Sequence, residues 1–458
     1  MTVATVDRSE TAFDRRLIVP MVLGSVLNPI NSSMIAVALV PIGLALGALP
    51  SETAWLVSAL YLATATGQPV VGKLVDRYGP RHLYLAGSAL VGIAGVLGLL
   101  APNLGVLIVS RVFLGLGTCA GYPAAMYLIR SESRRTGKDS PGGVLTALAV
   151  SAQTIIVIGP TLGGLLIGLG GWRSIFAVNI PLALACVVFG LLRMPRFAGA
   201  APATRLDFLG IGLFAGTLTA LMLYLMDPAL NDLWLLAVMA VCAGGFAWRE
   251  LRATDPFLDL RVFGGNGPLI ATYVRALLAQ TASYAILYGF TQWLEAGRGL
   301  SASHAGLVLL PMSLFAIVIS GVTGRRKAYR PKLIVGGLGQ LVVSVLMLTL
   351  NADSPLWLPV LVTLICGLPQ GLNNLANQNA LYYQADPSRI GAASGLLRTF
   401  SYLGAMVSSA ATGIYFKHGA DTAGLHGLAI FLTVVAALML ILVLADRSLS
   451  RVGSGSPS

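Results

Sequence analysis

Charge is what this sequence has least of. Only 10% of its 458 residues are Asp, Glu, Lys or Arg, and 56% are hydrophobic. Because an ordinary soluble domain carries roughly 25% charged residues, the composition excludes a soluble globular protein and predicts an integral membrane protein. The formal net charge of +12 does not indicate nucleic-acid binding, since most Lys and Arg residues fall in tails or loops on one side of the predicted spans.

Residues that carry chemistry are also scarce. The four cysteines lie in apolar runs without CxxC spacing, which excludes a disulfide framework and a zinc site. The four histidines lie at the edges of such runs. Deep Ser/His pairs, Asp pairs and metal-ligand clusters are missing, so we expect no catalytic residue, no metal and no cofactor. We therefore predict that the protein is not an enzyme.

The acidic residues are few, and their placement is informative. All 18 Asp and Glu residues fall in predicted tails, loops or span ends, and none falls in mid-membrane. Proton coupling needs a group that titrates within the transport path, and a bound cation needs a counter-charge. The sequence therefore leaves protons as an open candidate for coupling, and it favours a neutral or anionic ligand over a cationic one.

Long apolar runs dominate the rest of the chain. Runs of about 20 apolar residues can each cross a bilayer as a helix, and we count about fourteen of them. They lie near 17–45, 54–72, 83–101, 104–129, 142–168, 174–193, 207–227, 232–248, 268–293, 304–324, 333–351, 356–380, 390–416 and 424–445. An even number of spans places both termini on one side, and the basic residues that flank them predict the cytoplasmic side.

One charged stretch, 72–81, lies between two of these runs and reads GKLVDRYGPR. We interpret it as a short loop in which glycines let two helix ends approach and Asp76 accepts bonds from backbone N–H groups. Charge alone is equally consistent with a simple topology anchor. The run resembles the signature loop G-x-L-x-D-R-x-G-x-R of the major facilitator superfamily of secondary transporters. This resemblance implies a cytoplasmic gate made of Gly72, Asp76, Arg77, Gly79 and Arg81.

Three further stretches support the resemblance. The run RVFLGLG from Arg111 is similar to the R-x-x-x-G-x-G motif of the superfamily. The run GWRSIFAVNIP at 171–181 resembles a segment of the fourteen-span drug:proton antiporter branch. The run GPTLGG at 159–164 resembles the exporter motif; its proline kinks a helix and its glycines form a small-residue face, which ordinary packing could also use. The exporter-motif residues are Gly159, Pro160, Gly163 and Gly164.

The resemblance implies an all-α fold of two six-helix parallel-repeat halves with two inserted helices. A decayed second copy of the signature loop at 321–330 agrees with this plan. The expected units are a cytoplasmic tail, an N-terminal half, a linker with two inserted spans, a C-terminal half and a second cytoplasmic tail. Their bounds are 1–16, 17–193, 194–262, 263–446 and 447–458.

In this fold the first, fourth, seventh and tenth helices of the twelve-helix core line a cavity. Three of the corresponding runs carry polar residues on one helical face, and Arg111 lies too deep to reach the membrane surface easily. These residues could instead tie helices together. The candidate cavity residues are Asn28, Asn31, Ser32, Arg111, Tyr284, Tyr288, Gln370, Asn373, Asn374 and Asn377. Outside this set, we interpret Arg275 as a snorkelling anchor near the inner edge.

These observations predict a multi-pass protein of the bacterial inner membrane that exports small lipophilic compounds, neutral or anionic, by alternating access. Its partners would be the substrate and the lipid bilayer, with protons as the candidate coupling ion and no nucleic acid. Two alternatives stay open. One is a facilitator or importer of an anionic metabolite, and the other is a receptor or lipid-handling scaffold that does not transport.

Overall fold

The computed structural model describes residues 13–136, 142–196, 207–253, 256–323, 329–386 and 390–450. Within these ranges the chain is helical and contains no strand. Ten helices or joined helix pairs are long and apolar enough to cross a membrane. The protein is therefore a multi-pass, all-α membrane protein.

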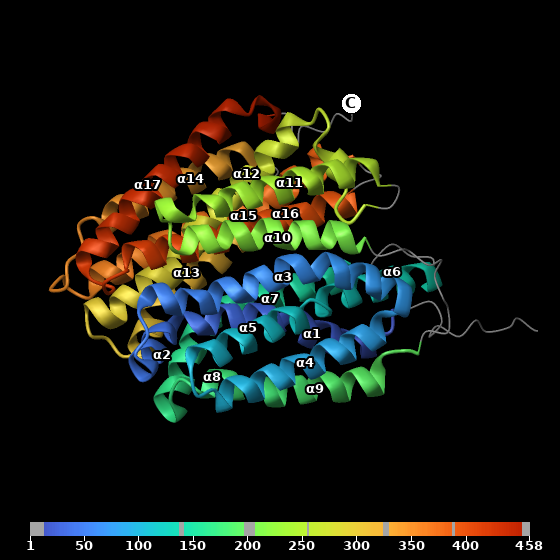
Figure 1. Ribbon diagram of the computed structural model, residues 1–458, viewed down its shortest axis with the longest axis horizontal. Coiled ribbons are helices and arrows are strands. Elements are labelled where there is room, and N and C mark those ends of the chain that lie inside the picture. The colour runs from blue at the N-terminus through green and yellow to red at the C-terminus, as the bar shows by residue number, and fades with distance from the viewer. Residues whose placement is uncertain are drawn as a thin grey trace, which may run out of the picture.

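The first part of the chain forms one bundle of helices, drawn in blue to green in Figure 1. In order these are α1 (Ile18–Met34), a 3-10 turn (Ile35–Val37), α2 (Leu39–Leu46), α3 (Pro50–Tyr78), α4 (Pro80–Leu100), α5 (Leu104–Thr118), α6 (Gly121–Thr136), α7 (Gly142–Gly170), α8 (Ser174–Ala177) and α9 (Asn179–Arg193). Short 3-10 turns also occur at Arg15–Leu17, Leu230–Asp232, Leu260–Phe263 and Arg447–Ser450.

The second part forms a hairpin and then another bundle. The hairpin consists of α10 (Phe208–Met226) and α11 (Leu233–Arg252). The bundle consists of α12 (Gly267–Ala285), two π-helical segments (Ile286–Phe290 and Trp293–Gly297), α13 (Ala302–Thr323), α14 (Tyr329–Met347), α15 (Trp357–Gln384), α16 (Ile390–Tyr415) and α17 (Thr422–Ala445). Each predicted apolar run coincides with one helix or with two joined helices.

Polar residues between the apolar runs start the helices. Asn103 caps α5 by accepting a bond from the Val106 N–H at 3.0 Å, and Asp421 caps α17 by accepting one from Gly424 at 2.7 Å. Side-chain oxygens of this kind satisfy N–H groups that have no partner within the helix. The sparse polar residues of the sequence therefore mark where one helix ends and the next begins.

The charged stretch 72–81 is not the loop that we expected. Helix α3 continues to Tyr78, and the break is confined to Gly79, whose φ of 84° suits glycine, before Pro80 begins α4. An apolar run marks only the part of a helix that lies in lipid, whereas polar residues can prolong the same helix into water. The hinge is therefore one residue long.

Three of the single runs that we expected are interrupted, and one of them, 174–193, breaks at Val178 between α8 and α9. The run 17–45 breaks at the 3-10 turn between α1 and α2, and the run 104–129 breaks between α5 and α6. The break between α5 and α6 lies beside a crossing of helices, because a Cβ on Gly121 would lie only 2.2 Å from the carbonyl oxygen of Gly24. Close packing against α1 thus accompanies the change of direction between α5 and α6.

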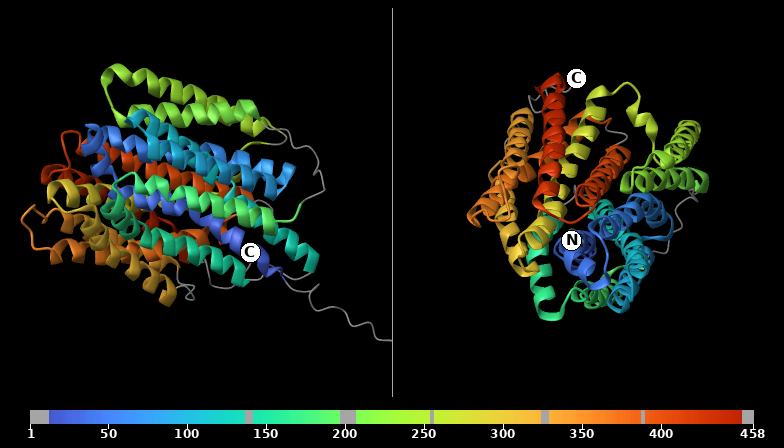
Figure 2. Two further views of the ribbon diagram at one scale, coloured as in Figure 1. Left: turned by 90° about the horizontal axis from the view of Figure 1, so that it is seen from below. Right: turned by 60° about the vertical axis from the view of Figure 1, so that its left-hand side comes forward.

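The two bundles meet along two helix pairs. Helix α7 packs against α13, and α3 packs against α16. The hairpin α10–α11 lies on the outside of the molecule, where α10 contacts both α3 and α16 (Figure 2). Asp207 begins α10 and accepts a bond from Arg249 of α11 at 3.0 Å. Burial acts to raise the pKa of Asp207, but the bonds from the Gly210 N–H and from Arg249 outweigh it and lower that pKa.

Glycines of α7 and α13 allow a close backbone contact between the bundles. A Cβ on Gly164 would lie 2.5 Å from the Ala302 oxygen, and one on Gly306 would lie 2.6 Å from the Pro160 oxygen. Hydroxyl groups bond across the same contact, from Thr161 to the Gly306 oxygen at 3.0 Å and from Ser303 to the Gly164 oxygen at 2.7 Å. We call this contact, made by residues 160–164 with 302–306, the seam.

The seam lies toward one end of the molecule, close to the loops 171–173 and 298–301, on the left in Figure 1. Helix α1 begins and α17 ends at the opposite end. The exporter-motif glycines are divided between two neighbours. Gly164 faces α13, whereas Gly159 and Gly163 face Ser33 and Met34 of α1.

Arg275 is not the snorkelling anchor that we expected. Its side chain is completely buried and forms an ion pair with Asp446 at 2.7 Å, just beyond the end of α17. It also donates a hydrogen bond to Thr272. The partner lies far away in the sequence, so the spacing of α12 alone could not indicate this pair. Arg275 therefore ties α12 to the end of α17.

The glycines of α13 provide a test of the seam. We expect Gly306→Ala to destabilise the protein by about 1–3 kcal/mol, because the added methyl group overpacks the contact with Pro160. Gly321→Ala lies on the same helix with nothing within 4 Å of its added Cβ, so it should leave the midpoint of thermal unfolding unchanged in detergent. Equal midpoints for the two variants would contradict a tightly packed seam.

Candidate substrate pocket

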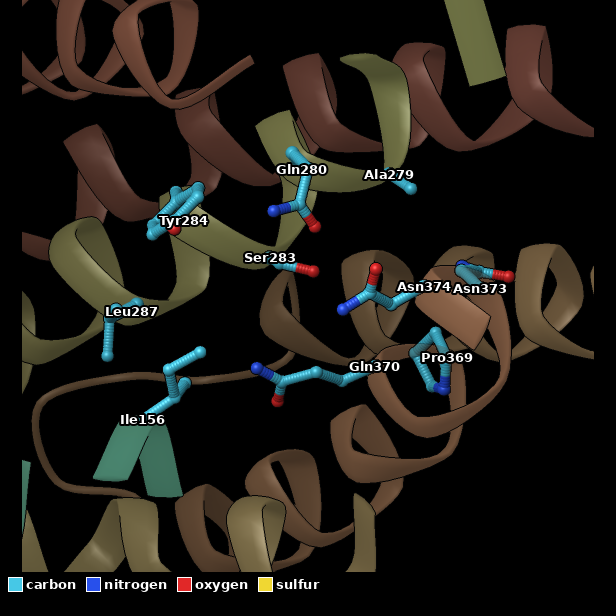
Figure 3. A pocket seen from close by; sticks show the side chains of 10 residues that line it. All are labelled: Ile156, Ala279, Gln280, Ser283, Tyr284, Leu287, Pro369, Gln370, Asn373 and Asn374. Carbon is cyan, nitrogen blue, oxygen red and sulfur yellow. The ribbon is translucent and has the colours of Figure 1, made fainter. Parts of the chain in front are cut away.

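A polar pocket lies between α12 and α15. It is lined by Ile156 of α7, by Ala279, Gln280, Ser283, Tyr284 and Leu287 from α12 and its extension, and by Pro369, Gln370, Asn373 and Asn374 of α15. In Figure 3, Gln370 and Asn374 point into the space between the helices, toward Gln280 and Ser283, whereas Asn373 points away from it. The lining contains amides, a serine hydroxyl and an aromatic ring, and no charged side chain.

A second pocket adjoins the first. It shares Ala279, Gln280 and Asn374 with the first pocket and adds Ala276, Asn377, Leu397 and Ser401. The added residues of α12 and α15 lie nearer to the end where α1 begins. Together the two pockets form a polar strip along α12, α15 and α16.

Amide oxygens along this strip have no partner. Gln370 Oε1, Asn373 Oδ1 and Asn377 Oδ1 are buried and accept no hydrogen bond. Buried polar groups are nearly always paired with protein or with ordered water. The oxygens of Gln370 and Asn377 are therefore candidates to bind a ligand or water, whereas Asn373 points away from the pocket and lies against Gly336 of α14.

The polar residues of α1 are paired with neighbouring helices. Asn31 and Asn179 of α9 exchange two amide hydrogen bonds, at 2.6 and 2.8 Å, and both side chains are buried. Asn28 donates to Thr118 at 3.1 Å, and the Ser32 hydroxyl bonds to the backbone oxygens of Asn28 and Pro29. Asn28 and Asn31 thus bond to neighbouring helices in this structure, whereas the Ser32 hydroxyl bonds within α1, and the part of these residues in a cavity stays a prediction.

Arg111 is buried between three helices of the first bundle. Its Nε donates to the Leu56 oxygen of α3 at 2.8 Å, and its Nη1 donates to the Asn31 oxygen of α1 at 3.2 Å. Its Nη2 has no partner, and no ion pair to it occurs in the described part of the chain. Arg111 does not line either pocket here, so its expected contact with a substrate stays a prediction.

Four tyrosines join the two bundles near the pocket. Tyr284 stacks on Tyr288 with ring centroids 5.6 Å apart, and Tyr61 of α3 packs against Tyr284 at 5.3 Å and against Tyr402 of α16 at 5.8 Å. The Tyr288 hydroxyl, which lies 3.3 Å from that of Tyr61, donates to the Ser32 oxygen at 2.8 Å. This cluster therefore connects α3 of the first bundle with α12 and α16 of the second.

The signature-loop residues lie at the end where α1 begins, and Lys73 among them donates to the Pro256 oxygen, outside the first bundle, at 2.8 Å. Arg77 lies over the ring of Tyr78, and Arg81 donates to the Leu191 oxygen at 3.0 Å. Asp76 is exposed, and a Cβ on Gly72 would meet nothing within 4 Å. Contacts between the bundles on this side include that of Arg398 of α16, whose guanidinium lies 3.7 Å from the ring centroid of Tyr122 in α6, and the bond from the Tyr402 hydroxyl to Gln68 Oε1 of α3 at 2.6 Å.

Sequence reasoning named five of the pocket residues and missed others. Tyr284, Gln370, Asn373, Asn374 and Asn377 line the two pockets. Gln280 lies on the polar face of the run 268–293, one turn before Tyr284, so the spacing indicated it, although it is outside the candidate set named from the sequence. Ile156, Ser283 and Ser401 had no such signal, because each is a single small or apolar residue within an otherwise apolar run.

The two kinds of polar residue should respond differently to replacement. Asn31→Leu leaves the Asn179 amide buried without its partner, so we expect a loss of about 1–3 kcal/mol in unfolding free energy. Replacing both asparagines by leucine should recover part of that loss. Gln370→Leu removes an oxygen that has no partner and should leave thermal stability unchanged. Equal losses for Asn31→Leu and Gln370→Leu would contradict these assignments.

Comparison with known proteins agrees with this architecture. The sequence model of the Major Facilitator Superfamily matches residues 21–409. The uncharacterised MFS-type transporter YwoD of Bacillus subtilis (strain 168) is 32% identical over 442 residues, which cover 94% of this chain and 96% of YwoD. The tetracenomycin C resistance and export protein of Streptomyces glaucescens is 28% identical over 401 residues, 86% of this chain and 74% of that protein.

The fold is also similar to solved structures. The crystal structure of a mutant of the nucleoside transporter NupG superposes with a TM-score of 0.62 at 11% sequence identity, and the alignment covers 95% of this chain and all of that one. At this identity the likeness concerns the fold alone. The matched family, which spans most of the chain, consists of transporters and not of enzymes. The chain belongs to the major facilitator superfamily.

Proposed function

We propose that this transporter exports small lipophilic compounds, neutral or anionic, across the bacterial inner membrane by alternating access. In this proposal about fourteen spans cross the bilayer, with α1 and α2, α5 and α6, and α8 and α9 each forming one span. The excess of Lys and Arg in the tails and in the loops on one side supports a cytoplasmic position for both termini. The bundles α1–α9 and α12–α17 are the two halves that move.

With the termini in the cytoplasm, the seam lies at the outer face. The glycine contacts between α7 and α13 and the bond from Ser409 to the Ala54 oxygen at 2.8 Å hold the bundles together there. The second pocket extends the first toward the cytoplasmic end. These features support an outward-closed state, from which the opposite state would form when the bundles separate at the seam.

The chemistry of the polar strip supports the substrate class. Its lining offers unpaired amide oxygens beside an aromatic ring and contains no carboxylate. A cation would find no counter-charge there, and the positive charges of Arg398 and Arg111 would oppose it. A neutral compound with hydrogen-bond donors, or an anion, would be accommodated better. The drug-resistance and export relatives support efflux as the direction.

Export can be tested in cells that overproduce the protein. We expect greater protection from neutral or acidic lipophilic compounds than from ethidium-like cations. Gln370→Leu should reduce that protection without changing the amount of folded protein, because the pocket wall contributes little to packing. A protonophore should abolish export against a gradient if the transport is energised by protons, whereas a facilitator would be unaffected.

Ser32→Asp places a carboxylate on α1, near the hydroxyls of Tyr61 and Tyr288, and should shift the preference toward cations. Ser25→Asp is the matched control, because Ser25 lies on the same helix, about two turns closer to its start. Efficient ethidium export by the native protein, unchanged by Ser32→Asp, would show that the electrostatic argument is wrong.

The signature loop is proposed to close the cytoplasmic side in the opposite state. Asp76 is exposed here, so Asp76→Asn should leave folding intact while it weakens that closure. We expect faster labelling of a cysteine placed at Asn377 by a reagent added from the cytoplasmic side. Asp353→Asn, at an exposed acid near the other end, should not change the rate. An unchanged labelling rate for Asp76→Asn would indicate that the loop serves only as a topology anchor.

A further inference from the structure

The extension of α12 contains two π-helical segments, Ile286–Phe290 and Trp293–Gly297. A π-helical turn is rare, and such turns occur frequently at functional sites. The first segment contacts the 3-10 turn Ile35–Val37 of the other bundle, and the second contacts α13 and α17. Because Tyr288 also bonds to Ser32, the extension is part of the contact that holds the two bundles together.

Three polar side chains follow one another along this extension, and none has its hydrogen bonds complete. Gln292 Nε2, Glu295 Oε1 and Arg298 Nη1 are all buried and have no partner. They account for three of the twelve such side-chain atoms in the described part of the chain. Arg298 is also within reach of the outer loops, since it donates to the Ser354 oxygen and lies over the ring of Trp293. We call these three side chains, which follow one another from the loop end of the α12 extension, the polar file.

Glu295 is the group in this file that can titrate. Only 6% of it is exposed, and no cation lies within ion-pair distance of it among the described residues. The titratable groups at this end of the neighbouring elements have other partners. His304 of α13 bonds to Ser301, His426 of α17 to the Leu350 oxygen and Asp421 to the Gly424 N–H.

A carboxylate that is buried without a cation or a complete set of donors is costly, and burial favours the neutral, protonated form. The other buried glutamate with an unpaired oxygen differs in this respect. Glu250 accepts a bond from the Leu258 N–H at 2.9 Å and belongs to the hairpin α10–α11, away from the seam. Glu295, in contrast, has no such bond and lies in the segment that packs against α13, the helix that carries the seam.

We propose that Glu295 is a proton-binding site that is coupled to the opening of the seam. While the seam is closed, the carboxyl holds a proton. When the bundles separate, water reaches Glu295 through the end of the file, the carboxyl releases its proton to the outer solution, and the carboxylate is hydrated. The assignment of this end to the outer solution rests on the orientation given under the proposed function.

The sign of the pH dependence follows from this linkage. A proton is bound in the closed state and lost in the open state, so rising pH favours opening. Above the pKa that a hydrated glutamate has in the open state, the ratio of closed to open molecules falls by up to about tenfold for each pH unit. Acid conditions should therefore keep the seam closed.

The test measures the distance between the outer ends of the two bundles. Spin labels are attached to cysteines at Leu49 and His418, two exposed positions on different bundles, in a variant whose native cysteines are replaced by alanine. Double electron–electron resonance on the purified full-length protein in lipid nanodiscs then follows the closed and open populations between about pH 5 and about pH 9. Glu295→Gln is compared with Asp353→Asn, which removes an exposed acid near the same end.

We expect the Asp353→Asn protein to shift toward the longer distance as the pH rises, with a change of at least about tenfold in the closed-to-open ratio. Glu295→Gln mimics the protonated carboxyl and should stay closed, with a change of less than about twofold. If Glu295→Gln folds poorly, Glu295→Ala serves in its place and should also lose the pH dependence. A pH dependence that persists in the Glu295 variant, or that is absent from both proteins, would overturn the proposal. Because no substrate is involved, the result is independent of whether the protein exports drugs.

Discussion

Close approach of helix backbones at the seam is the constraint on which the rest of the structure depends. Within a bilayer, lipid tails are as apolar as leucine, so helices are held together by tight packing and by hydrogen bonds between them. Gly164 and Gly306 allow α7 and α13 to come so near that the hydroxyls of Thr161 and Ser303 reach carbonyl oxygens of the opposite helix. The same closure brings Tyr61 against Tyr284 and buries the extension of α12.

Polar residues have two different fates in this closed state, and the difference separates support from recognition. In the first bundle, the amide of Asn31 meets that of Asn179, and Arg111 finds carbonyl oxygens on two neighbouring helices. On α15, in contrast, Gln370 and Asn377 keep amide oxygens without partners. These polar groups of the first bundle fix its own helices. In the second bundle some polar groups do the same, as Arg275 does with Asp446, while Gln370 and Asn377 line the pockets.

The sequence predicted the helices far better than it predicted the partners of their side chains. Apolar runs placed each helix because the thickness of the bilayer sets their length. The apolar run 54–72 could not show that α3 continues to Tyr78, because the polar residues that prolong the helix into water are not part of the run. Spacing along each helix placed both Asn31 and Asn377 on a polar face. Only the structure shows that Asn31 has a partner on another helix. The prediction for Arg275 was wrong for the same reason. Its ion-pair partner, Asp446, lies 171 residues away, so spacing within α12 could not indicate the pair.

A carboxyl at the edge of the bundle is better suited to couple protonation to conformation than one that stays buried throughout. A ligand shifts an equilibrium only by the difference in its affinity for the two states, and a proton obeys the same rule. A group that keeps the same surroundings in both states would bind its proton equally in each and would shift nothing. Glu295 lies in the π-helical segment that packs against α13, the helix that carries the seam, and the proposal requires that opening of the seam gives water access to it. The lack of acids in mid-membrane is therefore compatible with proton coupling, provided that the coupling acts at the seam.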